Sequence, residues 1–559
     1  MKILVEGYCY EFNSYADVLE EVGYTPVDID KGRVRSVGYC FCPSINDNVF
    51  VLPKVVLDEN QKLFSVYKPE EFFDLDLLLK NGVINNQQWL FIQNFAIWLY
   101  KALKTFKKRN PESSIITEKV RLNLFNSNTA SLKSSSLLDV IIALVDFYKN
   151  HQNFLLFSLQ ESHRGLNRIN WPKTISRTKT HITNAGPIYL TPISKKQQID
   201  QRDELYVLYF SILSHIARKY GFVVKIPVGV ELITNNRFEE YLRYKGTVAL
   251  KKIKNKYFSD ITRQLWKLCY QFFSLNERIF SNKSEKEYLL ATNFEIVFES
   301  MIDSLISDNN LPPNIKEQMD GKVIDHVFKH KSLFGDGCIY YVGDSKYYKS
   351  GAEVSGYSEF KQYTYGRNIV QLHVASLSKR YEDELHYQDE LTEGYNVTPN
   401  FFISPIVSKK FSFKDSEFTC RVDSTKKSFH FRNRLFDRDT YWLIHFDINL
   451  LFVFSMYSKK PDGVPKLFKM SFRDKIRSQL LSVLNAKYDF WILTPKLLSL
   501  EVAYSKYFRQ LLGKAFKTTS DSKMLILALE KESDEPNEPL LKLLEEDFRL
   551  DKYEVLSGV

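Results

Sequence analysis

The chain has 559 residues, of which 26% are charged and 14% aromatic, and its formal net charge is +10. This length predicts roughly two to four domains, and the positive charge favours a polyanionic partner. Its six cysteines form no Cys-x-x-Cys pair and no Cys/His cluster with ligand spacing. This excludes a zinc site and a disulfide framework and favours a reducing, cytoplasmic setting.

The first 80 residues predict mainly β-structure. Segments 1–12, 36–43 and 48–57 are β-branched or aromatic and are separated by Gly, Pro, Asn and Asp. The N-terminus reads as a strand, because it lacks the charge pattern and cleavage site of a signal peptide. The most apolar window, Tyr441–Tyr457, is too short and too polar to span a bilayer, so we expect no membrane association.

Two helices and a long irregular segment follow. Amphipathic periodicity predicts helices over Gln87–Lys107 and Ser134–Lys149. Residues 160–192 are polar, basic and interrupted by Gly and Pro, and a connection this long is usually functional or disordered. The apolar residues embedded in it, Trp171 among them, argue against disorder. Trp171 is either a partner anchor or a side chain that fills the core of its own domain.

A helix-rich stretch, Gln201–Asn282, is predicted to connect this N-terminal part with the rest of the chain. It contains the basic run KKIKNK, Lys251–Lys256. Two interpretations of this run remain open: contact with a DNA backbone, or a charged helix face exposed to solvent.

The next helix brings acidic side chains. Ser284 and Glu287 form a capping box at the start of Ser284–Ser307, which carries an apolar stripe at helical spacing. Glu295 and Glu299 lie one turn apart on a flank of that stripe. The periodicity does not choose between them, and both can also be ordinary solvated acids.

Residues 321–366 hold the densest set of reactive side chains. Two β-type runs, Lys322–Phe328 and Ile339–Tyr348, predict a hairpin whose first strand carries Asp325 and whose second carries Asp344 and Lys346. Side chains two apart on a strand share a face. Two carboxylates from adjacent strands can hold a divalent metal, and a neighbouring lysine can orient the attacking water. These are the parts that phosphodiester cleavage requires, although a surface hairpin with an Asp–Lys ion pair is the simpler alternative.

The hairpin leads into a predicted helix, Gly356–Ser378, which carries Gln362, and then into apolar strands at Asn400–Val407 and Tyr441–Phe446. Beyond residue 460 the pattern predicts helices to about Leu529 and then an acidic tail. No stretch has the Gly-rich sequence of a phosphate-binding P-loop, so we expect this chain to bind no nucleotide.

The segments Ile324-Asp325 and Asp344-Ser345-Lys346, in this helix–strand–strand–helix order, resemble the PD-(D/E)XK nuclease superfamily. The resemblance implies Mg²⁺ or Mn²⁺ as cofactor. It implies metal ligands at Asp325, Asp344, the Ser345 carbonyl and a glutamate of the preceding helix, for which we slightly prefer Glu295 to Glu299. It also implies catalytic roles for Lys346 and Gln362.

A second resemblance concerns the stretches RINW (168–171), VGYCFC (37–42) and FRNRLFDRDTYWLIHFDINLLFVFSMY (431–457). They are similar to McrC, the nuclease subunit of modification-dependent restriction systems, and closer still to the McrC-like subunit of the LlaJI restriction family. This resemblance implies double-stranded DNA as substrate and a separate McrB-like AAA+ GTPase as partner.

The sequence therefore predicts a mixed α/β protein with a PD-(D/E)XK core. We expect a β-rich and helical module at 1–200 that docks on the motor, a helical connector at 201–281, the nuclease at 282–460, and a helical extension at 461–559. The expected function is DNA cleavage within a GTPase-dependent restriction system. A stand-alone or repair-type endonuclease and a non-catalytic DNA- or partner-binding scaffold remain the alternatives.

Overall fold

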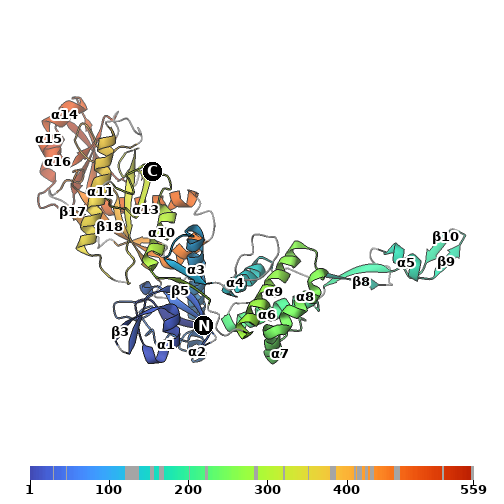
Figure 1. Cartoon of the computed structure of the whole chain (residues 1–559). Helices are drawn as coiled ribbons and strands as arrows, with labels where there is room; N and C mark the ends of the chain where they lie inside the picture. Colours follow the sequence, from blue (N-terminus) through green and yellow to red (C-terminus); the bar gives the residue numbers. More distant parts are fainter. Residues whose placement is uncertain are drawn as a thin grey trace. The chain divides into compact units, whose positions relative to one another are not determined.

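The computed structural model describes residues 1–28, 30–45, 47–119, 137–151, 157–162, 169–184, 186–199, 202–220, 224–281, 287–318, 321–335, 337–349, 352–377, 385–407, 411, 418–421, 426–428, 433–458, 466–518 and 522–555 (Figure 1). The chain divides into two compact units. The helical unit contains residues 118–288 with Met1 and 41–47, and the α/β unit contains 2–40, 48–117 and 289–559.

The N-terminal residues form two small sheets. One has the order β1-β6-β5-β12-β7, with strands β1 (Lys2–Val5), β5 (Val37–Cys42), β6 (Asp47–Leu52), β7 (Ile116–Lys119) and β12 (Glu287–Ala291). The other has the order β2-β4-β3, with strands β2 (Cys9–Glu11), β3 (Tyr24–Asp28) and β4 (Lys31–Val34). The helices of this region are α1 (Phe12–Val22), η1 (Lys54–Val56), α2 (Leu75–Lys80) and α3 (Asn86–Arg109). Every residue of β5 is buried, which explains its nearly continuous apolar sequence.

A six-stranded sheet forms the centre of the α/β unit. Its order is β13-β14-β15-β18-β16, with β17 also paired to β18. Its strands are β13 (His326–Lys331), β14 (Cys338–Ser345), β15 (Asn400–Ile406), β16 (Phe418–Cys420), β17 (Lys426–Ser428) and β18 (Tyr441–Asn449). Strands β14, β15 and β18 are parallel to one another, and β13 is antiparallel to β14.

Four helices accompany this sheet, namely α10 (Phe294–Ile306), α11 (Gly356–Leu377), α12 (Leu450–Ser458) and α13 (Lys466–Lys487). Helix α11 lies between β14 and β15 in the chain and packs on both, as a crossover between parallel strands requires. Helix α10 packs against β13 and β14 and also contacts α3 and α12. The N-terminal α3 is thus part of the same core as the predicted nuclease.

The C-terminal residues form an antiparallel sheet of order β20-β21-β19-β22. Its strands are β19 (Tyr488–Pro495), β20 (Ala515–Phe516), β21 (Leu525–Glu530) and β22 (Phe548–Tyr553), and its helices are α14 (Leu500–Lys506), α15 (Phe508–Leu511) and α16 (Glu538–Leu544). The segment that the sequence predicted as a helical extension is therefore mixed α/β. The residues of β21, LILALE, favour helix locally, but pairing with β19 overrides that propensity.

The helical unit is built from α4 (Leu137–Asn150), α6 (Glu204–Tyr220), α7 (Asn235–Glu240), the π-helix η2 (Tyr241–Lys245), α8 (Gly246–Ile253), η3 (Lys254–Lys256) and α9 (Asp260–Ser281). Their buried aliphatic and aromatic residues share one core. Gly246, at the η2–α8 junction, packs against α9, since a Cβ there would lie 2.3 Å from the ring of Phe273.

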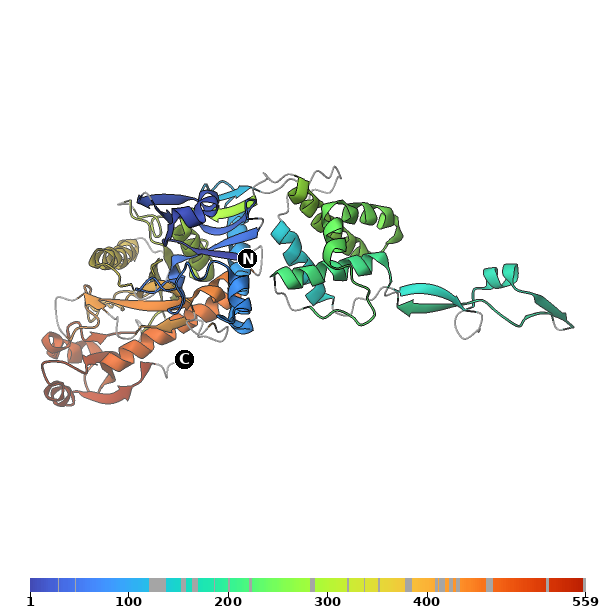
Figure 2. The ribbon, with the colours of Figure 1, turned by 90° about the horizontal axis from the view of Figure 1, so that it is seen from below.

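Residues 157–199, which we call the β8–β11 insertion, interrupt this unit (Figure 2). Strands β8 (Phe157–Ser162) and β11 (Ser194–Ile199) pair antiparallel and enclose α5 (Trp171–Arg177) and the hairpin β9 (Thr180–Thr183)–β10 (Gly186–Tyr189). The predicted irregular segment thus contains regular elements wherever the structure describes it. Arg168, at the start of the RINW motif, lies outside the described residues.

These elements confirm the predicted mixed α/β class. The compact units divide the chain differently from the predicted modules, because residues 2–40 and 48–117 belong to the same unit as 289–559. None of the six cysteines, all of which lie in the described ranges, forms a disulfide. Within the described residues, no helix is long and apolar enough to cross a membrane.

Candidate active site

The hairpin of β13 and β14 brings the two aspartates together. Strand β13 begins at His326, which pairs with Gly343, so Asp325 immediately before the strand comes beside Asp344. The backbone N–H of Ser345 donates a hydrogen bond of 3.0 Å to a carboxylate oxygen of Asp325. Asp344 and Lys346, two residues apart, therefore lie at the end of the buried strand β14, as the sequence predicted.

Lys346 and Asp344 form an ion pair. The Lys346 Nζ lies 2.5 Å from an Asp344 carboxylate oxygen and 5.1 Å from the centre of the Phe402 ring. Asp344 is only 2% exposed. Burial and the neighbouring charge of Asp325 raise the pKa of Asp344, and Lys346 opposes that rise. The site thus contains two crowded carboxylates and a nearby amine, all largely shielded from water.

Helix α10 presents its two glutamates to different surroundings. Glu299 is half-buried, and burial together with the charge of Asp325 raises its pKa to about 7. Glu295 is exposed, and its charge acts on Glu6 and Tyr347 of the same unit. Of the two candidates, Glu299 is therefore the one whose pKa is raised by the charge of Asp325.

Helix α11 gives a similar contrast between neighbours. Gln362 is fully buried, and its amide donates to the Val342 carbonyl of β14 at 3.4 Å. The next residue towards the N-terminus, Lys361, feels the charges of Asp344 and Asp325. Burial works against its charged form, but a hydrogen bond with Tyr365 and these two carboxylates raise the pKa of Lys361. Two neighbouring residues of α11 thus have different surroundings. Gln362 hydrogen-bonds to strand β14, whereas the pKa of Lys361 is raised by the charges of Asp344 and Asp325.

A buried histidine supports the Asp-Ser-Lys segment. The Nε2 of His326 lies 2.7 Å from the Ser345 hydroxyl, and its Nδ1 lies 3.3 Å from a carboxylate oxygen of Asp303 on α10. Burial opposes ionisation of Asp303, but His326 and Lys316 outweigh it and lower the pKa of Asp303 to about 2. Sequence reasoning missed His326, although its place beside Asp325 was a usable signal.

The donor set suits a divalent metal in its chemistry. Carboxylates with a backbone carbonyl are the hard oxygen ligands that Mg²⁺ prefers, and a cation would relieve the crowding that raises the pKa of Asp344 and Glu299. Among the described residues, no three His, Cys or acidic side chains converge closely enough to hold a metal as they stand. Lys346 occupies one Asp344 carboxylate oxygen, Oδ2, in this arrangement.

The two aspartates and Lys346 lie in a segment that matches a known protein family. Residues 92–349 match the family model described as LlaJI restriction endonuclease. The chain is similar to LlaJI restriction endonucleases. This LlaJI-like segment begins in α3 and ends three residues after Lys346, so it includes the glutamates of α10 and both aspartates but excludes α11. The resemblance predicted from the sequence is confirmed over these residues.

No curated protein matches the chain. A solved structure titled "Refined half-complex from tetradecameric assembly of Thermococcus gammatolerans McrB AAA+ hexamers with bound McrC" covers 86% of this chain and 99% of its own, with 10% identity and a TM-score of 0.26. A TM-score this low carries no argument about fold, so the candidate site rests on the LlaJI-like segment and its own geometry.

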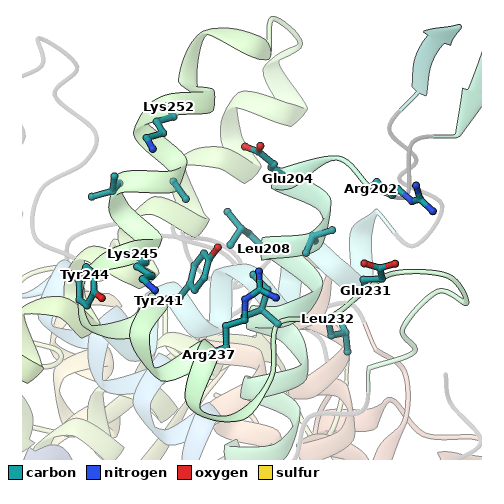
Figure 3. Close-up of a pocket in the computed structure, with 14 residues that line it drawn as sticks. Arg202, Glu204, Leu208, Glu231, Leu232, Arg237, Tyr241, Tyr244, Lys245 and Lys252 are labelled. Carbon is teal, nitrogen blue, oxygen red and sulfur yellow. The ribbon is translucent and has the colours of Figure 1, made fainter.

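The LlaJI-like segment also contains a hollow of about 880 Å³ in the helical unit (Figure 3). It is lined by residues 202–252 alone, among them Arg237, Tyr241, Lys245 and Lys252, so none of the predicted catalytic side chains belongs to it. Lys245 is paired with Glu240 at 2.5 Å. This pocket is open, mixed in charge, and separate from the Asp325–Asp344 site in its residues.

Proposed function

We propose that this chain is the DNA-cleaving subunit of a restriction system and that it hydrolyses phosphodiester bonds of double-stranded DNA with a divalent metal, Mg²⁺ or Mn²⁺. The observation that carries the proposal is the meeting of Asp325, Asp344 and Lys346 at adjacent strand ends inside the LlaJI-like segment. A PD-(D/E)XK core accounts for this arrangement, because its mixed sheet and flanking helices have the expected order along the chain.

In this mechanism Asp325, Asp344 and the Ser345 carbonyl would hold the metal. When bound, the metal would supply positive charge at the phosphate and make a water a better nucleophile. Lys346, released from Asp344, orients the attacking water by donating a hydrogen bond to its oxygen, since an ammonium group can only donate. His326 keeps the Asp-Ser-Lys segment in place through the Ser345 hydroxyl, and Lys361 adds positive charge near the reacting phosphate.

A third carboxylate from α10 completes the ligand set. The slight preference for Glu295 drawn from the sequence remains a prediction. The electrostatic surroundings favour Glu299, because Asp325 raises its pKa whereas Glu295 acts on Glu6 and Tyr347. Gln362 hydrogen-bonds to the Val342 carbonyl of β14, so its proposed support of the metal-site water is indirect and acts by holding this strand in place.

A cleavage assay on the purified full-length chain tests the proposal. We expect Mg²⁺-dependent nicking or cutting of double-stranded DNA, alone or with a motor subunit added, and its loss in Asp344→Asn. DNA binding that persists without any cleavage, with Mg²⁺, Mn²⁺ and a motor subunit all supplied, would instead support a non-catalytic scaffold.

The partner proposed for this subunit is a separate AAA+ GTPase, with both proteins in the cytoplasm. The support is the McrC-like motif around Trp171 and the exposure of apolar side chains in the β8–β11 insertion. Trp171 is 52% exposed, contacts the Tyr189 ring and fills no core. Ile182 and Leu190 are still more exposed. Apolar side chains gathered at one segment are typical of a protein-binding surface.

The partner is tested with a McrB-like AAA+ GTPase of the same source organism. Trp171→Ala in the full-length protein is expected to weaken binding to the GTPase and its stimulation, while metal-dependent cleavage without the GTPase is unchanged. Ile296→Ala, which removes an exposed apolar side chain elsewhere, is the matched control. Full cleavage activity with no GTPase binding at all would support the stand-alone endonuclease.

A further inference from the structure

The N-terminal residues contact the chain directly after the Asp-Ser-Lys segment. The Tyr347 hydroxyl donates to a Glu6 carboxylate oxygen, and the backbone N–H of Lys54 lies 3.1 Å from the same oxygen and 3.2 Å from the Tyr347 hydroxyl. Tyr347 is 4% exposed. Lys54 is therefore held beside Tyr347 by backbone and side-chain contacts, and its Nζ lies 4.6 Å from the centre of the Tyr347 ring.

Three positive side chains near this contact interact through their charges. Lys349 is half-buried, its Nζ donates to the Gln61 side-chain oxygen at 2.7 Å, and its pKa is lowered by burial and by the charges of Arg33 and Lys54. Arg33 is exposed, and its Nε lies 3.5 Å from the Cys9 sulfur. In the described part of the chain, none of the three makes an ion pair within 4 Å. We call Arg33, Lys54 and Lys349 the cation cluster.

Two carboxylates lie near the cation cluster, and the charge of Lys54 acts on one of them, Glu6. Glu6 accepts hydrogen bonds from Tyr347 and the Lys54 amide, and burial raises its pKa. Glu295 is exposed, and its charge acts on Glu6 and Tyr347. Burial and the charges of Arg33 and Lys54 lower the pKa of Lys349, and an anion bound between these three cations would offset their repulsion.

The chain itself relates the cation cluster to the candidate active site. Lys349 follows Lys346 by three residues, and three residues of extended chain span at most about 11 Å. Lys54 lies at Tyr347, the residue directly after Lys346. Phosphates of one DNA strand recur about every 3.4 Å along the duplex axis. A strand whose scissile phosphate lies beside Lys346 therefore has a neighbouring phosphate within reach of the cation cluster.

We propose that Arg33, Lys54 and Lys349 bind a backbone phosphate of the cleaved strand next to the scissile one. The inference rests on the proposed nuclease function and adds to it a DNA-binding role for the N-terminal β-structure. Because the contact is to phosphate, it holds the strand in register without reading sequence. Residues 2–40 and 48–117, which belong to the same unit as the candidate active site, thus contribute to binding its DNA substrate.

The test is DNA binding by the full-length chain in Ca²⁺ over a series of salt concentrations. We expect Arg33→Gln/Lys349→Gln to weaken binding and to reduce the slope of log affinity against log salt by about 1, the value for the loss of one phosphate contact. Arg35→Gln/Lys62→Gln removes the same charge from nearby positions that do not act on Lys349, and it is expected to change the slope by less than half as much.

A second variant leaves all three cations in place. Gln61→Glu puts a carboxylate at the hydrogen-bond partner of Lys349 and is expected to weaken DNA binding by competing with the phosphate. Salt slopes equal to wild type in both variants, in a chain that cleaves DNA, would overturn the cation cluster as a phosphate site and leave the nuclease intact. Reduced slopes in a chain that never cleaves would keep the site and reject the nuclease. Loss of binding to an acidic protein partner with unchanged DNA binding, or no DNA binding by wild type, also rejects the site.

Discussion

The two units use charge in opposite ways. In the α/β unit, Asp344 and Lys346 are largely enclosed, and burial changes the pKa of Asp344 and of its neighbour Glu299. In the helical unit, the run Lys251–Lys256 is mostly exposed, and Lys254 lies 5.8 Å from the centre of the Trp266 ring. Enclosed charges interact strongly and can do chemistry, whereas exposed charges are screened and can mainly bind.

The same contrast separates two aromatic residues. Tyr347 is buried between Glu6 and α10 and ties the N-terminal strands to the active-site hairpin. Trp171, in the β8–β11 insertion, is half exposed and touches Tyr189. A buried aromatic residue fixes a fold, and an exposed one is available to a partner. Chemistry is therefore expected in the α/β unit and only binding in the helical unit, a division that four experiments can test.

The largest effect is expected from Asp344→Asn. The variant keeps the shape of the side chain but removes the negative charge that pairs with Lys346 and that we propose as a metal ligand, so cleavage should fall at least ~10³-fold, about 4 kcal/mol of transition-state stabilisation. Single-turnover cleavage measures the loss, and Asp551→Asn in β22 is the control. Residual activity within about tenfold of wild type, only ~1.4 kcal/mol, would reject the site. Lys346→Ala is expected to abolish cleavage likewise.

Metal exchange should be nearly as severe. We expect cleavage with Mg²⁺ or Mn²⁺, none with Ca²⁺, and none after EDTA, because the water nucleophile needs a small, strongly polarising ion. The comparison is made at equal DNA occupancy, which a binding assay in each metal establishes. Strong cleavage in EDTA would remove the metal from the mechanism and with it the assigned roles of Asp325 and Asp344.

A moderate effect on stability is expected from Glu299. Its folded-state pKa of about 7 is raised above the ordinary value of 4.5, so the folded chain holds an extra proton between these values and loses stability as pH rises through them. In EDTA, Glu299→Gln should raise the melting temperature relative to wild type at pH 8 and not at pH 4.5. Glu295→Gln, one turn away and exposed, should show no such difference, and equal behaviour of the two would contradict the assignment of Glu299 to the site.

The smallest effect is expected from the exposed lysines. Replacing Lys251, Lys252 and Lys256 with Gln should reduce the salt dependence of DNA binding by up to about one slope unit per phosphate contact, and should leave the cleavage rate at saturating DNA unchanged. The control replaces three lysines of the C-terminal sheet region, Lys523, Lys542 and Lys552. If the slope is unchanged, the run is a solvated helix face. If the cleavage rate itself falls, the division between the two units is wrong.

The sequence alone determined the features that depend on neighbours along the chain. The apolar run ending in Asp344-Ser345-Lys346 predicted a buried strand with a polar end, because side-chain alternation is a local property. The apolar stripe predicted helix α10 from Phe294 on, but the predicted helix start and its capping box were wrong, since Glu287–Ala291 pairs as strand β12. The basic run Lys251–Lys256 and the mixed α/β class were also predicted from local sequence patterns. For the candidate site, local pattern was therefore enough to name the hairpin, its two aspartates and its lysine.

Only the tertiary structure shows which charges act on which side chains. The charge of Asp325 raises the pKa of Glu299, and Asp325 and Asp344 together raise that of Lys361, because packing between elements far apart in the chain sets the surroundings of each side chain. The same reason applies to Glu6 and Tyr347, which meet across 341 residues. It applies again to β21, whose helix-favouring residues are held as a strand by β19. Contacts between distant residues outweigh local propensity there, and the sequence carries no local signal of them.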